Sequence, residues 1–188
     1  MKELFFITGN KGKVHEAKEK LLPLGFSVVQ KDLGYPEVQA DSLEEVAAWG
    51  ATHVQERFDH PFMLEDAGLF IDTLQGFPGV YSKYVFFTIG LSGILQLLSE
   101  VKDRKAVFRS VYAYSEPKHK PIIAVGECKG VISREQRGKN GFGYDPIFLP
   151  KGLRRTFGEM TTDEKNKYSH RSKALDKLIL KLKKDNNF

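Results

Sequence analysis

Short apolar runs and helically spaced apolar residues alternate in the first part of the chain. The runs Leu4–Thr8 and Phe26–Gln30 have the length of buried strands, and each adjoins a glycine that favours a turn. Between them, apolar residues recur at helical spacing after Asn10, which is a suitable N-cap. Ser42 begins an S-x-x-E capping box and predicts a second helix that ends near Arg57. Thr161 begins another capping box and predicts the start of a later helix.

The rest of the chain is richer in strand-like segments. Ala106–Tyr114 and Ile122–Ile132 contain many β-branched and aromatic side chains and predict a long antiparallel pair. Helices are predicted over Ile89–Val101 and over the C-terminal segment, where an apolar stripe from Ala174 to Leu182 lies opposite lysines. This mixture predicts an α/β fold with a long mixed β-sheet flanked by helices, built as a single domain over residues 1–188.

Composition excludes several classes of protein. The chain has 188 residues, of which 41% are hydrophobic and 28% charged, as is ordinary for a globular protein. Its apolar runs are too short for a membrane-spanning helix, and the N-terminus lacks the apolar stretch of a secretory signal. The single cysteine, Cys128, excludes an intrachain disulfide and a cysteine metal cluster, and we expect it to pack in the interior. A cytoplasmic protein with no membrane partner is expected.

The formal net charge of +5 arises in the C-terminal part of the chain. Residues 1–150 hold 18 basic and 19 acidic side chains, whereas residues 151–188 hold 11 basic and 5 acidic ones. Such a basic segment suits either a nucleic acid or a small polyanion. The lysines from Lys173 to Lys184 lie on the polar face of the predicted last helix, so we expect them to be solvated and to steer a ligand by their field.

The segment after the first strand has the composition of an anion-binding turn. A glycine-containing turn at a helix N-terminus exposes backbone N–H groups that favour an anion, and two lysines add positive charge. The spacing of a Walker A loop is absent, so the segment alone is also compatible with an ordinary polar turn. It consists of Thr8, Gly9, Asn10, Lys11, Gly12 and Lys13.

Two adjacent acids follow the predicted strand Phe62–Leu64. Ligands bind at strand ends in open α/β sheets, and neighbouring side chains on an extended segment point to opposite sides. One of Glu65 and Asp66 is therefore expected to face a site, where a carboxylate could bind Mg²⁺ or activate a water as a general base. Glu37, just after Pro36, could join the cation. The alternative is a solvated pair of acids.

Two later segments carry groups that suit a nucleotide. A glycine-containing loop with aromatic residues offers a face for a base, although a tight turn has the same composition. A lysine and a His-Arg pair offer donors for phosphate and for planar acceptors, or else form a solvated basic face. Together with the turn and the carboxylates, these residues fit a nucleoside triphosphate with Mg²⁺. They are Phe142, Gly143, Tyr144 and Asp145 in the loop, and Lys165, His170 and Arg171.

The chain resembles the inosine triphosphate pyrophosphatase (Ham1-like) family in five motifs. The motifs occur in the family's order and span nearly the whole chain, so the resemblance is specific. They are T-G-N-K-G-K (8–13), L-E-D-A-G-L (64–69), F-P-G-V-Y-S (77–82), F-G-Y-D-P-I-F (142–148) and S-H-R (169–171).

The resemblance implies a homodimeric α/β protein with two lobes and a central substrate cleft. It also implies Mg²⁺-dependent hydrolysis of XTP, ITP and dITP to the monophosphate and pyrophosphate, by attack at the α-phosphorus. Asp66 would be the proton acceptor and a metal ligand, and Glu37 a second metal ligand. Residues 8–13 would hold the triphosphate, and the backbone at Ala67 would contact the substrate.

The resemblance assigns the remaining residues to the base and to phosphate. Phe142 would stack on the base, and the backbone from Gly143 to Asp145 would line its pocket. Lys165 would contact phosphate, while His170 and Arg171 would face the base edge. Because Arg171 has only donors, it would pair with the carbonyl at C6 of hypoxanthine or xanthine and disfavour adenine. This pairing does not explain the rejection of guanine.

The chain departs from the family pattern at two places. Ala67 stands where members often have serine, so only the backbone N–H is left to contact the substrate there. Many members also carry a lysine in the helix that is predicted here over 42–57, which contains none and has Trp49 near the expected place. Neutralisation of phosphate would then depend more on Lys13 and Lys165.

Two other functions remain open from the residues. A pyrophosphatase acting on modified pyrimidine nucleotides, or on ordinary nucleoside triphosphates, would use the same groups. A nucleic-acid-binding protein would use the lysines of the last helix, but it would leave Asp66, Glu37 and the glycine-containing turn without a role. We therefore expect a small-molecule substrate and no stable nucleic-acid partner.

Overall fold

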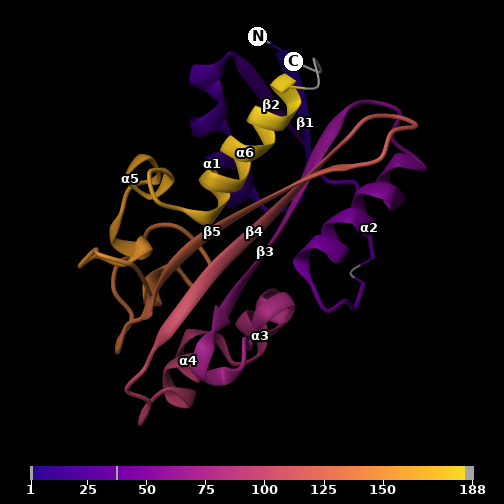
Figure 1. Ribbon diagram of the computed structural model, residues 1–188. Coiled ribbons are helices and arrows are strands. Elements are labelled where there is room, and N and C mark those ends of the chain that lie inside the picture. The colour runs from indigo at the N-terminus through magenta and orange to yellow at the C-terminus, as the bar shows by residue number, and fades with distance from the viewer. Residues whose placement is uncertain (1, 37, 185–188) are drawn as a thin grey trace. The chain divides into compact units, whose positions relative to one another are not determined.

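The computed structural model describes residues 2–36 and 38–184, and within them six strands form one sheet in the order β2-β1-β3-β4-β5-β6 (Figure 1). The strands are β1 (Lys2–Ile7), β2 (Phe26–Lys31), β3 (Phe62–Ile71), β4 (Lys105–Ser115), β5 (Ile122–Ile132) and β6 (Phe148–Pro150). The helices are α1 (Lys11–Leu21), α2 (Leu43–Gln55), α3 (Ser82–Thr88), α4 (Gly90–Leu97), α5 (Thr162–Asn166) and α6 (His170–Lys184).

The sheet is mixed, as the sequence predicts. β1 is parallel to both β2 and β3, whereas β5 and β6 are antiparallel. β4 and β5 are neighbours joined only by residues 116–121, which are too few for a parallel crossover, so this pair is antiparallel. The α/β fold with a long mixed sheet flanked by helices is thereby confirmed.

The chain divides into two compact units, and β3, β4 and β5 each contribute residues to both. The first unit consists of residues 1–66, 110–126 and 171–188, as far as they are described, and the second of residues 67–109 and 127–170. Among the helices, α1, α2 and most of α6 belong to the first unit, and α3, α4 and α5 belong to the second.

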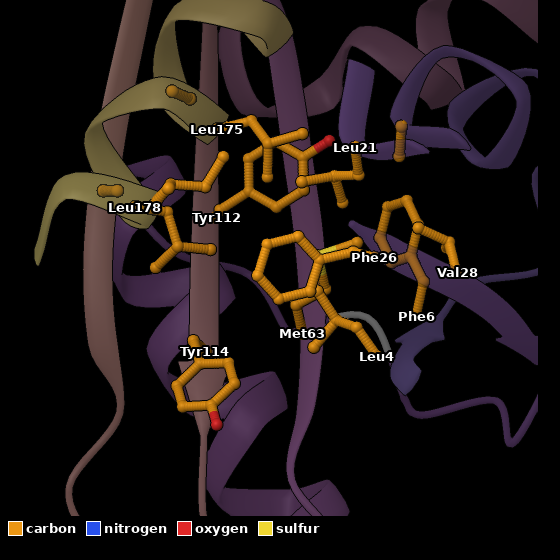
Figure 2. Close-up of a cluster of buried hydrophobic side chains, with 14 of the residues drawn as sticks. Leu4, Phe6, Leu21, Phe26, Val28, Met63, Tyr112, Tyr114, Leu175 and Leu178 are labelled. Carbon is orange, nitrogen blue, oxygen red and sulfur yellow. The ribbon is translucent and has the colours of Figure 1, made fainter. Parts of the chain in front are cut away.

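The core of the first unit is built from β1, β2, the segments of β3, β4 and β5 that belong to this unit, and one face each of α1 and α6. Figure 2 shows Leu175 and Leu178 of α6 beside Tyr112 of β4, and Phe26 beside Phe6. The apolar stripe predicted for the last helix is confirmed, because all its members are buried: Ala174, Leu175, Leu178, Ile179 and Leu182.

The core of the second unit is rich in aromatic rings. Phe108 lies with its ring centroid 4.6 Å from that of Phe148, which in turn lies 5.4 Å from that of Phe157. Cys128 is buried in the same cluster, in agreement with its expected packing role. Within the described residues, no helix is both long and apolar enough to cross a membrane.

Local capping signals fix the starts of three helices. The Asn10 side chain accepts hydrogen bonds from the backbone at the start of α1, and Ser42 and Thr161 form reciprocal capping boxes with Glu45 and Glu164. Such side chains satisfy N–H groups that have no partner within the helix. The predicted helix starts near residues 10, 42 and 161 are confirmed.

Two expectations about the elements need correction. The predicted helix Ile89–Val101 is shorter, since α4 ends at Leu97, and α3 over Ser82–Thr88 was not predicted. Gly90 has a φ of 63°, which interrupts the helical backbone between α3 and α4. The predicted strand Phe62–Leu64 is also longer, because β3 continues to Ile71.

The expectation that the lysines of α6 are solvated also needs correction, because two of them contact the backbone of β5. Lys177 Nζ donates to the carbonyl of Val125 at 2.8 Å, and Lys181 Nζ donates to the carbonyl of Ile123 at 2.7 Å. Both carbonyls belong to the part of β5 that precedes its pairing with β6, which starts at Gly130. The two ammonium groups therefore cover acceptors along a sheet edge, where unpaired backbone groups could otherwise recruit another strand.

Candidate active site

The turn before α1 is ordered by its own asparagine. Asn10 Oδ1 accepts hydrogen bonds from the backbone N–H groups of Gly12 at 2.9 Å and Lys13 at 3.2 Å. The Asn10 N–H in turn donates to Thr8 Oγ1 at 3.1 Å. Two of the N–H groups expected to face an anion are thus already paired, so the lysine side chains are the stronger anion-binding groups of this turn.

The parallel pairing of β1 with β3 brings the turn and the two acids to the same end of the strands. Ile7 is the register partner of Leu64, so Thr8 and Glu65 follow at corresponding positions. The acids are not at the end of β3 itself, but they lie where β1 stops pairing with it. Ligand sites in parallel sheets form at such carboxyl ends.

Glu65 and Asp66 differ in burial, as expected for neighbours on a strand. Asp66 is half-buried, whereas the Glu65 side chain is fully buried. Glu65 Oε2 lies 2.8 Å from Lys13 Nζ, and Oε1 accepts a hydrogen bond from Ser110 Oγ at 2.6 Å. The Lys13 ammonium also donates to the Glu65 carbonyl at 2.8 Å. This arrangement joins the turn, β3 and β4.

Arg171, in the first turn of α6, belongs to the same cluster. Its Nε lies 3.2 Å from Glu65 Oε1, and its Nη1 lies 3.5 Å from Glu16 Oε2 of α1. Burial by itself raises the pKa of Glu65, but the charges of Lys13 and Arg171, together with hydrogen bonding, outweigh it and lower that pKa below the usual 4.5. The cluster thus combines two cations with two carboxylates. A role for Arg171 at the base edge stays a prediction.

Sequence reasoning did not assign functions to Glu65 and Glu16. Glu65 was considered only as the neighbour of Asp66, and Glu16 was not singled out. The sequence does contain a signal for each of them. Glu16 lies three residues after Lys13 on the same helix, so the two side chains share a face. Glu65 follows the buried run Phe62–Leu64. An acid that continues a buried run needs a buried cation as its partner.

A second group of candidate residues lies in the second unit. Lys165 Nζ and Asp145 Oδ2 are 2.6 Å apart, and each side chain is only 2% exposed. The same oxygen accepts a hydrogen bond from the Phe142 N–H at 2.8 Å, which closes the loop 142–145. The Lys165 ammonium also lies 4.9 Å from the centroid of the Phe142 ring. The ion pair therefore stiffens the aromatic loop, and contact of Lys165 with phosphate stays a prediction.

Further hydrogen bonds and stacking hold this group in place. The Tyr144 hydroxyl donates to the Ser82 carbonyl at 2.8 Å, and burial raises the pKa of this phenol well above its usual value. His170 is buried and stacks on Phe108, with ring centroids 4.5 Å apart and planes 9° apart. Ala67 is half-buried on β3, and Gly143 has a φ of 60°, which favours glycine.

Where the family resemblance predicts a lysine in α2, the helix carries aromatic side chains instead. Trp49 of α2 is 38% exposed and stacks on His53, with centroids 5.1 Å apart. A Cβ on the next residue, Gly50, would lie 2.9 Å from the Tyr35 ring, so glycine permits this close approach. The described part of α2 therefore offers aromatic surface and no lysine.

The described residues contain no group of three His, Cys, Asp or Glu side chains that could hold a metal ion. Glu37, the second predicted ligand, lies outside the described residues. Mg²⁺ commonly uses one or two protein carboxylates and completes its shell with water and substrate phosphates. The half-buried carboxylate of Asp66 beside the turn fits such a cation, which would depend on the substrate for further ligands.

A strand-to-helix turn that carries lysines at the carboxyl end of parallel strands is typical of α/β proteins that bind the phosphate groups of a ligand. The comparison with known families agrees with this class. Residues 4–181 match the model described as Ham1 family, and the chain belongs to that family. The resemblance inferred from the five motifs is confirmed.

Relatives and a solved structure are similar over nearly the whole chain. The chain is 53% identical over 175 residues to the dITP/XTP pyrophosphatase of Methanopyrus kandleri, covering 93% of each chain. It is 55% identical over 172 residues to the dITP/XTP pyrophosphatase of Thermococcus kodakarensis, covering 92% of each. The HAM1 protein from Coxiella burnetii has a TM-score of 0.82 at 33% identity, covering 98% of this chain and 100% of that one.

Proposed function

We propose that this chain is a nucleoside triphosphate pyrophosphatase that hydrolyses XTP, ITP and dITP to the nucleoside monophosphate and pyrophosphate. Such an enzyme removes non-standard purine nucleotides from the nucleotide pool. The observation that carries this proposal is the 53% and 55% identity to two proteins named dITP/XTP pyrophosphatase, over more than nine-tenths of each chain. The Lys13–Glu65 contact beside the turn gives it a physical basis.

In the first unit, we assign the triphosphate to the turn 8–13. Lys13 donates to phosphate oxygens, and Asp66 accepts the proton of a water that attacks the α-phosphorus. The bond from the α-phosphorus to the bridging oxygen breaks, and pyrophosphate leaves. Ala67 contributes its backbone N–H.

Nucleotide pyrophosphatases of this family are generally metal-dependent. We propose Mg²⁺ as the metal, held by Asp66 together with Glu37. When bound, the ion offsets the negative charge of the phosphate oxygens. The carboxylate of Asp66 thus serves both as a ligand and as the proton acceptor.

In the second unit, we assign the base to the aromatic loop. Phe142 offers the stacking face, and the ion pair between Asp145 and Lys165 keeps the loop ordered beneath it. Lys165 is assigned to phosphate, because an ammonium group donates to phosphate oxygens. His170 and Arg171 are assigned to the edge of the base.

The proposal includes three properties of the whole molecule. The family match runs from residue 4 to residue 181 and so includes residues of both units, which supports treating the chain as one functional domain. We further propose a homodimer and, because its substrates belong to the nucleotide pool, a cytoplasmic location.

One assay separates the proposed activity from its alternatives. The purified chain is incubated with Mg²⁺ and each of XTP, ITP, dITP, ATP, GTP and CTP, and pyrophosphate and orthophosphate are measured separately. We expect pyrophosphate from the first three nucleotides at a kcat/KM at least about a hundred-fold above that for ATP or CTP. Release of orthophosphate would place the attack at another phosphorus and contradict the proposal.

The nucleic-acid alternative is tested with the same preparation. A salt-sensitive gel shift with duplex or single-stranded DNA, without any nucleotide turnover, would favour it. The contacts of Lys177 and Lys181 with β5 carbonyls count against a basic binding face on α6, because they engage two of its cations.

A further inference from the structure

We propose that Glu65 is a positioning residue for pyrophosphate release, acting through Lys13. The carboxylate holds the lysine ammonium in one place beside the turn, so that a remaining N–H bond is directed to a phosphate oxygen. This inference rests on the proposed function and assigns a role to a residue that does not itself touch the substrate.

The contacts of the Lys13 ammonium carry the first step. An ammonium group has three N–H donors. One donates to the backbone carbonyl of Glu65 at 2.8 Å, and the ammonium also forms an ion pair with Glu65 Oε2 at 2.8 Å. These are the contacts that the ammonium makes among the described residues, so at least one N–H is left for a ligand. The Lys13 side chain is 16% exposed, so it is not fully enclosed by the protein.

The Glu65 carboxylate is itself held, so it can hold Lys13. Its Oε1 accepts a hydrogen bond from Ser110 at 2.6 Å and lies 3.2 Å from Arg171 Nε. Oε2 is thereby turned toward Lys13. A supported side chain fixes its partner far better than a mobile one does, and such fixed donors act most strongly in the transition state.

Burial excludes a direct part for Glu65 in the chemistry. Its side chain is fully buried, whereas its neighbour Asp66 is half-buried. A carboxylate that is enclosed by two cations and a hydroxyl has no opening toward a triphosphate. Glu65 therefore acts through the lysine, and its loss should affect the step in which the Lys13 donor is needed.

A second lysine–carboxylate ion pair in the same unit serves as a control. Lys20 of α1 and Asp176 of α6 also approach to 2.8 Å, but their side chains are 25% and 50% exposed. This pair joins two helices at the surface and is not part of the charge cluster around Glu65. Asp176→Asn consequently removes a lysine–carboxylate pair between α1 and another element without changing Lys13.

The test compares Glu65→Gln with the wild-type chain, using pyrophosphate release from dITP with Mg²⁺. Glutamine keeps the size of the side chain but loses its charge, so Lys13 is held less firmly. We expect kcat to fall at least about ten-fold while KM changes less than about three-fold, as for an interaction that matters in the transition state. Asp176→Asn should match the wild type in both constants.

A double-mutant cycle shows whether the effect passes through Lys13. In a Lys13→Met background, Glu65→Gln should cause no further loss of kcat, because the group that it positions is already absent. Equal losses in both backgrounds would overturn the inference, and so would a Glu65→Gln chain that keeps its kcat within two-fold.

Folding and function are checked separately. If Glu65→Gln does not give a folded chain by circular dichroism, Ser110→Ala replaces it, since this change frees one oxygen of Glu65 and leaves all charges in place. We then expect a fall in kcat of about three-fold that disappears in the Lys13→Met background, and an unchanged kcat would overturn the inference. A wild-type chain that releases no pyrophosphate would show that the proposed function itself is wrong, and this inference with it.

Discussion

The buried ion pair between Lys165 and Asp145 permits a quantitative prediction. Both side chains are 2% exposed, and the contact is 2.6 Å long. Lys165→Met removes the cation but keeps most of the side-chain volume, so the Asp145 carboxylate stays buried with the Phe142 N–H as a remaining partner. Breaking a buried pair from one side costs about 3–5 kcal/mol.

The size of this loss follows from the surroundings of the pair. Because neither side chain has appreciable contact with water, screening does not reduce the interaction as it does at the surface. We therefore expect Lys165→Met to lower the free energy of unfolding by about 3 kcal/mol or more. Urea unfolding followed by circular dichroism at neutral pH measures the change.

A double variant provides the control. Lys165→Met combined with Asp145→Asn removes both charges while the asparagine carbonyl can still accept from Phe142, so at least half of the lost stability should return. A Lys165→Met chain whose free energy of unfolding lies within about 1 kcal/mol of the wild type would refute the reasoning. It would mean that the carboxylate finds other stabilisation, or water, in the absence of lysine.

Three further predictions concern the role of Asp66 as proton acceptor, the stability of the chain at low pH and the edge of the sheet at β5. Asp66→Asn should lower the rate of pyrophosphate release at least about a hundred-fold without changing the circular dichroism spectrum, and near-normal activity would exclude Asp66 as the proton acceptor. The hydrogen bond from Arg155, together with that from the backbone of Thr161, lowers the pKa of Glu164 to about 2. The stabilisation that the ionised Glu164 carboxylate provides is therefore complete above about pH 4.5 and is lost as the pH falls toward 2. Glu164→Gln should accordingly flatten the dependence of the urea midpoint on pH between 4.5 and 2, and an unchanged slope would count against this pairing. Lys177→Met with Lys181→Met should uncover the β5 carbonyls and increase self-association on mild heating, as measured by light scattering, and unchanged scattering would show that the edge needs no cover.

Features that depend on neighbouring residues could be predicted from the sequence. Asn10, Ser42 and Thr161 cap helices through contacts within three residues, and all three were identified. The stripe on α6 was visible for the same reason, since its period is local. The break at Gly90 was missed because a glycine inside a helical pattern does not reveal the sign of its φ.

Contacts between distant parts of the chain could not be predicted in the same way. The sequence indicated Lys13, Asp145, Lys165 and Arg171 as candidates, but it did not show which acid each cation meets. The pairs form because the fold brings residues 52 and 20 positions apart together, as in Lys13 with Glu65 and Lys165 with Asp145. Long-range pairing also explains the lysines of α6, whose acceptors on β5 carry no sequence signature.

The central claim is that the chain cleaves non-standard purine nucleoside triphosphates between the α- and β-phosphates. The most direct test is a product analysis with XTP and Mg²⁺, in which the monophosphate, pyrophosphate and orthophosphate are quantified with time. We expect the monophosphate and pyrophosphate to appear in equal amounts from the start, with no diphosphate intermediate. Formation of XDP with orthophosphate, or no turnover of XTP, ITP and dITP, would contradict the claim.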